Sequence, residues 1–213
     1  MKSYGKLVGA LLGAWFVFAL TASAAHVFTN NFNRIGLAVA AAAVIPILLF
    51  GLWFGLSRDF RRFTLELNPQ ALTFAQSWRV LGAMFVVLQT YNILPAIFAL
   101  PAGYGDIFIG ITASLVAWKY ANPANRTLFI AWQLLGMADL LTAVTLGTTA
   151  PFIQPHGIPT TPMTVLPLSL IPTFLVPLFL ILHIICIAQA KGWKQSAEGA
   201  ERNIKPAQSV YAQ

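Results

Sequence analysis

Long apolar segments separated by short polar connections dominate this chain. Residues 35–56, 80–105 and 140–190 contain no Asp, Glu, Lys or Arg. A helix needs about 20 apolar residues to cross a hydrocarbon core of ~30 Å. Strands of a membrane barrel would instead alternate in polarity over ~10 residues, and these segments do not alternate. The pattern predicts an all-α, polytopic bundle of six transmembrane helices. The expected spans are about 7–25, 35–56, 72–94, 104–118, 127–149 and 165–190.

Composition supports this interpretation and limits the partners. Hydrophobic residues make up 58% of the chain and charged residues 9%, whereas a soluble domain has about 25% charged residues. We therefore expect a transmembrane domain over residues 1–190 and a polar cytoplasmic tail over 191–213. The net charge of +7 does not indicate nucleic acid, because the cations lie at the edges of the apolar segments. The expected partner is the lipid bilayer, and the sequence sets no oligomeric state.

The cationic residues predict the orientation, because cytoplasmic loops are enriched in Lys and Arg. Loops on one side of the six expected spans carry eleven cations, and those on the other side carry only Arg34. Both termini should then lie in the cytoplasm, in an inner membrane of the bacterial type. The eleven are Lys2, Lys6, Arg58, Arg61, Arg62, Lys119, Arg126, Lys191, Lys194, Arg202 and Lys205.

The first span has a second interpretation. Lys2 and Lys6 precede an apolar run that ends in Ala22-Ser23-Ala24, and this order resembles a secretory signal peptide with a small-residue cleavage site. Cleavage would leave five spans with the new N-terminus outside. The charge rule does not separate the two cases, since the following loop is external in both.

The segment before the fourth span is apolar but rich in helix-breaking residues. Pro95, Pro101, Gly103 and Gly105 oppose a continuous helix. We expect irregular backbone here, either an external turn or a short re-entrant element, with glycine conformations closed to other residues. Asp106 would then lie in the first turn of the fourth helix, where the helix dipole favours an anion. It is either a helix cap or a site carboxylate that shapes an outward-facing entrance.

Asp139 lies near the middle of the fifth span, where an unpaired charge is costly and usually functional. Arg79, in the third span, is its candidate counter-ion, although a long side chain of this kind also extends toward the interface. Asp139 alternatively makes a structural hydrogen bond between helices. The proposed polar site comprises Arg79, Gln89, Asn92, Asp106, Gln133, Asp139 and His183.

Metal and cofactor sites are not expected. The single cysteine, Cys186, excludes a disulfide framework within the chain and any cysteine-based metal centre. His183 lies inside the sixth span, where it is either a helix contact or a proton carrier. A bis-histidine haem needs a second ligand at the same depth, and His26 and His156 fall in external loops.

Two short resemblances accompany this pattern. Gly103-Tyr104-Gly105-Asp106 resembles the GxGD signature of intramembrane aspartyl proteases, which implies Asp106 and Asp139 as a catalytic pair. Asp139 follows the signature, whereas the partner aspartate of presenilin-type members precedes it. The longer segment 94–106 is similar to uncharacterised bacterial multi-pass membrane proteins with a PAGxGD-type motif, and this resemblance implies no function.

The favoured function is transport of a small solute, ion or proton, or ligand binding, through an intramembrane polar site. Asp139 would be the proton- or cation-responsive group and Arg79 its counter-ion. The alternatives are an intramembrane enzyme, either the two-aspartate protease or a quinone-type redox protein, and a non-catalytic membrane assembly partner. An enzyme is the less favoured reading.

Overall fold

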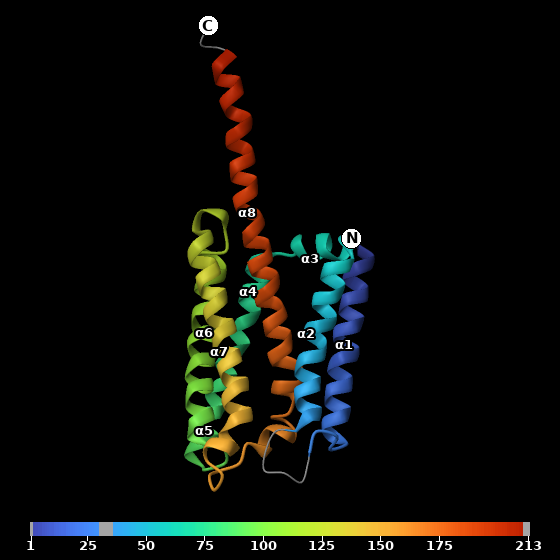
Figure 1. Cartoon of the computed structure of the whole chain (residues 1–213), viewed down its shortest axis with the longest axis vertical. Helices are drawn as coiled ribbons and strands as arrows, with labels where there is room; N and C mark the ends of the chain where they lie inside the picture. Colours follow the sequence, from blue (N-terminus) through green and yellow to red (C-terminus); the bar gives the residue numbers. More distant parts are fainter. Residues whose placement is uncertain (1, 30–35, 211–213) are drawn as a thin grey trace.

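The computed structural model describes residues 2–29 and 36–210, with side chains described for 4–29 and 36–193. All regular elements of these residues are helical, which confirms the all-α fold class. Six of the helices are long and apolar enough to cross a membrane. The first residues of α1 (Lys2–Ala24) and the C-terminal end of α8 (Val176–Val210) lie toward the same end of the bundle (Figure 1). The six candidate spans are Tyr4–Ala24, Leu37–Leu56, Pro69–Thr90, Ala96–Lys119, Pro123–Ile153 and Ile171–Trp193.

The first two spans are α1 (Lys2–Ala24) and α2 (Leu37–Leu56), and α3 (Arg58–Leu65) is a short helix that lies across one end of the bundle (Figure 1). Three consecutive elements form the third span, and α6, α7 and α8 follow. α8 continues through the segment expected as a polar tail. The elements after α3 are, in chain order, α4 (Pro69–Phe74), η1 (Ala75–Gly82), α5 (Ala83–Thr90), α6 (Ala96–Lys119), η2 (Pro123–Asn125), α7 (Arg126–Ile153), η3 (Thr161–Thr164), η4 (Ile171–Leu175) and α8 (Val176–Val210). The first three of them form the third span.

The expectation of irregular backbone before the fourth span is wrong. α6 begins at Ala96 and continues through Pro101 to Lys119. No described glycine has a positive φ. Membrane helices tolerate Pro and Gly because neighbouring groups satisfy the freed backbone, and here the glycines allow close helix packing instead of a turn. Asp106 is therefore the eleventh residue of α6 and does not lie in its first turn.

The third span begins at Pro69, slightly before the expected residue 72, because Asn68-Pro69 is a helix-start signal. The Asn68 side chain accepts hydrogen bonds from the backbone N–H groups of Gln70 and Ala71, which caps the helix that opens with Pro69. The middle of the span, η1, is a 3₁₀ helix. Its three residues per turn place positions three apart on one face, so Gln76, Arg79 and Gly82 are all buried.

The sixth span is shorter at its start than expected. It begins at Ile171, and the expected first residues from 165 form turns. Pro177 lacks the N–H that would bond the carbonyl of Thr173 four residues earlier. The Trp15 Nε1 donates to that carbonyl at 3.2 Å. This proline thus creates an acceptor that ties α1 to the C-terminal part of the chain.

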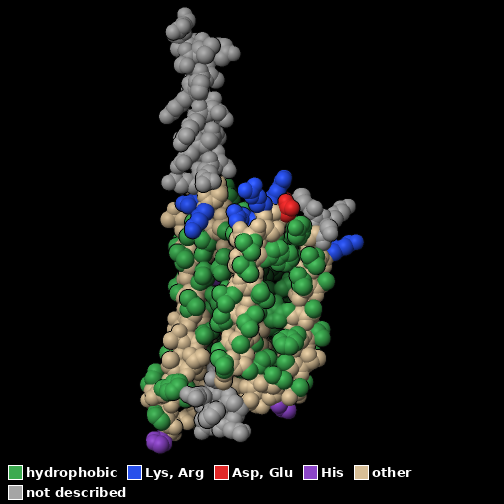
Figure 2. Space-filling model, turned by 45° about the vertical axis from the view of Figure 1, so that its right-hand side comes forward, with side chains coloured by type: hydrophobic (Ala, Val, Ile, Leu, Met, Phe, Trp, Pro, Cys, Tyr) green, Lys and Arg blue, Asp and Glu red, His purple; other side chains and the backbone are tan. Residues whose placement is uncertain are grey.

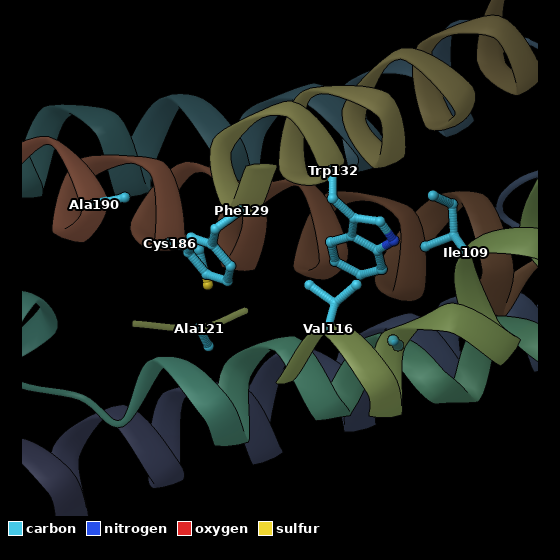
Figure 3. Close-up of a cluster of buried hydrophobic side chains, with 8 residues drawn as sticks. Ile109, Val116, Ala121, Phe129, Trp132, Cys186 and Ala190 are labelled. Carbon is cyan, nitrogen blue, oxygen red and sulfur yellow. The ribbon is translucent and has the colours of Figure 1, made fainter. Parts of the chain in front are cut away.

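Two apolar clusters lie on either side of the polar layer described below. One of them packs α6, α7 and α8 together toward the end where α3 lies, and it includes Val116, Phe129 and Trp132 (Figure 3). The other joins α5 and the first half of α6 with Met163 and Leu168. The charged groups of the site thus lie between two apolar clusters.

The two ends of the bundle differ in charge. Lys and Arg side chains gather at the end where α3 lies (Figure 2). Arg58, Arg61 and Arg62 belong to this group because α3 itself lies there. Arg34, the cation expected on the opposite side, lies outside the described residues. The described part of the chain thus has the one-sided charge distribution on which the orientation was predicted.

Candidate functional site

Four ionisable side chains lie near the middle of their spans. Asp106 is the eleventh of 24 residues in α6, and Asp139 is the fourteenth of 28 in α7. Arg79 and His183 lie at similar distances from the ends of Pro69–Thr90 and Ile171–Trp193. Ten residues of helix correspond to about 15 Å, half of a ~30 Å hydrocarbon core. Asp106 thus lies deep in the bundle.

Arg79 is the centre of the site, and it bonds both aspartates. Its Nε donates to the Asp106 Oδ1 at 2.7 Å, and one terminal nitrogen donates to the Asp139 Oδ2. The other terminal nitrogen donates to the Gly136 carbonyl at 3.1 Å. The Arg79 side chain is 1% exposed and each carboxylate side chain 14%. Arg79 therefore does not extend to the interface, and it acts as counter-ion to two carboxylates.

A directional chain of hydrogen bonds begins at Arg79. A guanidinium can only donate, so the His183 Nε2, 3.4 Å from the Arg79 terminal nitrogen, is the acceptor. His183 then donates from Nδ1 to the Gln133 Oε1 at 2.5 Å. The Gln133 amide donates to the Thr73 hydroxyl at 3.2 Å, and that hydroxyl donates to the Pro69 carbonyl at 2.8 Å. The directions of these bonds are mutually consistent when the imidazole is neutral, with Nδ1 protonated and Nε2 accepting.

Glycines allow the helices to approach closely enough for these bonds. A Cβ added at Gly105 would lie 1.6 Å from the Asp139 Oδ1, and one at Gly136 would lie 2.5 Å from the His183 ring. A Cβ at Gly110 would lie 2.4 Å from a backbone nitrogen of η1. Small residues at such interfaces let membrane helices pack closely. The glycine of the GxGD segment next to Asp106 thus makes room for the second aspartate.

The charges of this cluster do not balance if every group is in its common state. Asp106 and Asp139 contribute two negative charges, Arg79 one positive charge and neutral His183 none, which leaves one excess negative charge. A net charge at this depth is costly. The site is therefore suited to take up one proton or one small cation.

A small cavity of about 110 Å³ borders the cluster. Among the described residues, Asp106 is the only ionisable side chain that lines it, and apolar side chains from α2, α5, α6 and α7 form most of the remaining wall. The cavity extends from the cluster away from the basic end, toward Met163 and Ile171. One carboxylate of the cluster therefore faces a space large enough for a small molecule.

Two of the expected site residues are not brought into the cluster. Gln89 is half-buried in α5, and Asn92 is exposed in the turn that follows, with a φ of 56°. Within the described part of the chain, neither has a hydrogen bond to the other site residues. Two fully buried polar residues of the third span were not expected: Thr73, which is part of the hydrogen-bond chain, and Gln76, which lies next to it. Thr73, Gln76 and Arg79 follow one another at intervals of three residues, and this spacing is the signal that identifies the buried face.

Among the described residues, no group of three His, Cys, Asp or Glu side chains could hold a metal ion. In the GxGD proteases two aspartates share a water, whereas here the Arg79 guanidinium bonds both carboxylates. The resemblance to that family stays a prediction.

The fold and the site define the class of protein: an all-α protein with six helices suited to cross a membrane and a buried charged cluster at mid-span. Residues 34–190 match the family described as "Domain of unknown function (DUF8737)", and the chain belongs to this family. The match covers every residue of the cluster and agrees with the resemblance to a family of uncharacterised proteins. No curated protein and no solved structure matches the chain.

Proposed function

We propose that this is a multi-pass inner-membrane protein, with both termini cytoplasmic, that binds a proton or small cation at Arg79, Asp106 and Asp139 and couples it to binding or transport of a small solute. One observation carries the proposal: two carboxylates share a single guanidinium at mid-span. One positive charge more is needed to balance the cluster. Intramembrane carboxylates of this kind mark proton relays and ion pathways in transporters.

The cavity beside Asp106 supports the coupling step. A solute in the cavity would contact Asp106 and apolar side chains such as Phe85, Phe98 and Leu140. A change in the charge of Asp106 would change how well an apolar or cationic solute fits, because burial of an unbalanced charge is costly. Solute affinity and occupancy by the proton or cation are therefore linked, as thermodynamic reciprocity requires.

Infrared difference spectroscopy of the reconstituted protein tests the proposal. The carbonyl stretch of a protonated carboxylic acid should rise as the pH falls at fixed sodium, and it should disappear in either Asp106→Asn or Asp139→Asn. Asp59→Asn is the matched control, because Asp59 is the one other aspartate of the sequence and is exposed on α3. If the small cation is sodium, a sodium titration at fixed pH should change the carboxylate bands instead. A spectrum that responds to neither titration contradicts the proposal.

One observation favours a second candidate, a non-catalytic assembly protein. The hydrogen bonds of Arg79, His183 and Gln133 form a continuous chain that links the third, fourth, fifth and sixth spans. Polar contacts of this type join membrane helices without any transport. In that case the Asp variants lose stability, while neither protons nor sodium change the carboxylate bands of the unaltered protein.

A further inference from the structure

A large apolar groove lies away from the charged cluster, between α1, α2, α3 and α8. Its volume is about 1040 Å³, far larger than the cavity at Asp106. Val8 and Leu12 of α1, Ile45 and Leu49 of α2 and Ile181 of α8 are part of its wall. An apolar space of this size does not hold ordered water, because water needs several polar partners.

α1 contacts its neighbours on either side of a stretch that borders open space. Near the basic end, the Tyr4 ring lies 5.8 Å from the ring of Phe63. Farther along, Trp15 bonds the Thr173 carbonyl and packs edge-on against Phe174 at 4.8 Å. Between these contacts, no protein atom lies within 4 Å of a Cβ added at Gly9, a residue that lines the groove. A flexible hydrocarbon chain fits such a space.

The groove reaches the basic end of the bundle. Phe60, Phe63 and Thr64 of α3 line it there, and Gly5 of α1 lines it next to Lys6. The described charges of α1 and α3 at this end are four cations and two anions, which leaves a positive excess. They are Lys6, Arg58, Arg61 and Arg62 against Asp59 and Glu66.

Two of these cations are free to bind an anion. Arg62 pairs with Glu66 at 2.9 Å, and Arg61 donates to backbone carbonyls at the end of α2 at 2.8 and 3.0 Å. Lys6 and Arg58 are exposed and have no ion-pair partner among the described residues. Lys6 and Arg58 do not line the groove itself, but they belong to the two helices at its basic end. Apolar walls next to unpaired positive charge are the chemistry that binds an anionic phospholipid.

We propose that an anionic phospholipid occupies this groove, with an acyl chain between α1, α2 and α8 and its phosphate beside Lys6 and Arg58. The lipid completes the packing of α1 and α2 against the rest of the bundle. Most side chains of these two helices are otherwise exposed on the described surface. The proposal does not depend on the proton or cation site at Arg79.

Lipid titration of the purified full chain, followed by native mass spectrometry, tests this inference. Phosphatidylglycerol and phosphatidylcholine with identical acyl chains are the two probes. We expect tighter binding of phosphatidylglycerol, and loss of about fivefold in that preference for each cation removed in Lys6→Gln and Arg58→Gln. Lys119→Gln is the control, because Lys119 is exposed on α6, a helix that contributes no residue to the wall of the groove.

Two pairs of filling variants test the position of the acyl chain. Gly9→Leu should weaken binding of both lipids at least tenfold, whereas Gly13→Leu should not, because Gly13 is equally open but does not line the groove. Ile45→Trp fills the groove from α2, and Leu48→Trp is its exposed control outside the groove. The second pair decides the matter if Gly9→Leu fails to fold.

Three results would overturn the proposal. The first is equal binding of the two lipids by the unaltered protein. The second is equal lipid binding by each filling variant and its control. The third is a dimer that the filling variants dissociate while lipid binding is unchanged, which would assign the groove to a helix of a second copy.

Discussion

The cluster around Arg79 makes a quantitative prediction about stability. Arg79→Met leaves Asp106 and Asp139 buried without their shared cation, and breaking a buried pair from one side typically costs about 3–5 kcal/mol. The double variant Asp106→Asn/Asp139→Asn leaves the guanidinium, 1% exposed, without a counter-charge and should cost a similar amount. Each single Asn variant removes one charged hydrogen bond, and because it also removes the excess negative charge it should cost at most about 1.5–3 kcal/mol.

The triple variant Arg79→Met/Asp106→Asn/Asp139→Asn distinguishes a shared cluster from independent contacts. It removes all charges together, and such replacements are often close to neutral, so we expect a total loss within about 2 kcal/mol. If the three side chains acted independently, the losses would add to about 6–11 kcal/mol. The double variant Arg79→Met/Asp139→Asn should regain only part of the lost stability, because Asp106 stays buried without the guanidinium that it bonds in the unaltered protein.

Reversible unfolding in mixed detergent micelles, followed by far-UV circular dichroism, measures these differences. A matched exposed pair, Arg62→Gln with Glu66→Gln, is the control, because an exposed helical pair of this spacing contributes about 0.3–0.5 kcal/mol. Strictly additive losses across the three cluster positions would refute the reasoning. So would a triple variant that is less stable than every partial variant.

Three further predictions follow from the same geometry. Gly110→Ala should cost about 1–3 kcal/mol in the same unfolding assay, because its Cβ would lie 2.4 Å from a backbone nitrogen of η1, whereas Gly55→Ala, which meets no atom within 4 Å, should be neutral or stabilising. His183→Ala should cost about 1–3 kcal/mol, because the buried Gln133 carbonyl loses its donor, and an unchanged midpoint would remove His183 from the network. Reporter fusions after Gly157 and after Gln213 should report external and cytoplasmic sides, and identical reports from both would contradict the six-span topology.

The sequence was sufficient for the fold class and for the third span's start. Apolar runs of the right length identify six helices without knowledge of their neighbours, because each helix satisfies its own backbone. The Asn68-Pro69 start signal is equally local. The number of spans, which depends on the length and polarity of each segment alone, was therefore predicted correctly.

The depth of Asp106 was predicted wrongly for a physical reason. In a soluble protein, Pro101 and the neighbouring glycines would argue against a helix. In this bundle, α6 packs so closely against η1 and α7 that only glycine fits at several positions. Helix propensity was therefore overridden by interhelical packing, which no single segment of the sequence contains. The correct depth of Asp106 then brings it beside Arg79, and this pairing was not expected.

The spacing of polar residues nevertheless contains the arrangement of the site. In η1 the buried face repeats every three residues, at Gln76, Arg79 and Gly82, as a 3₁₀ helix requires. In α7, Gln133 and Asp139 lie at the same interval on either side of the glycine that approaches His183. Thr73 and Arg79 are six residues apart in the third span, and so are their partners Gln133 and Asp139 in α7, so the two helices contact each other at two levels. This explains why Arg79 can bond Asp139 while Gln133 reaches back to Thr73. A change that shifts either helix by one residue would therefore break the ion pair and the amide link together.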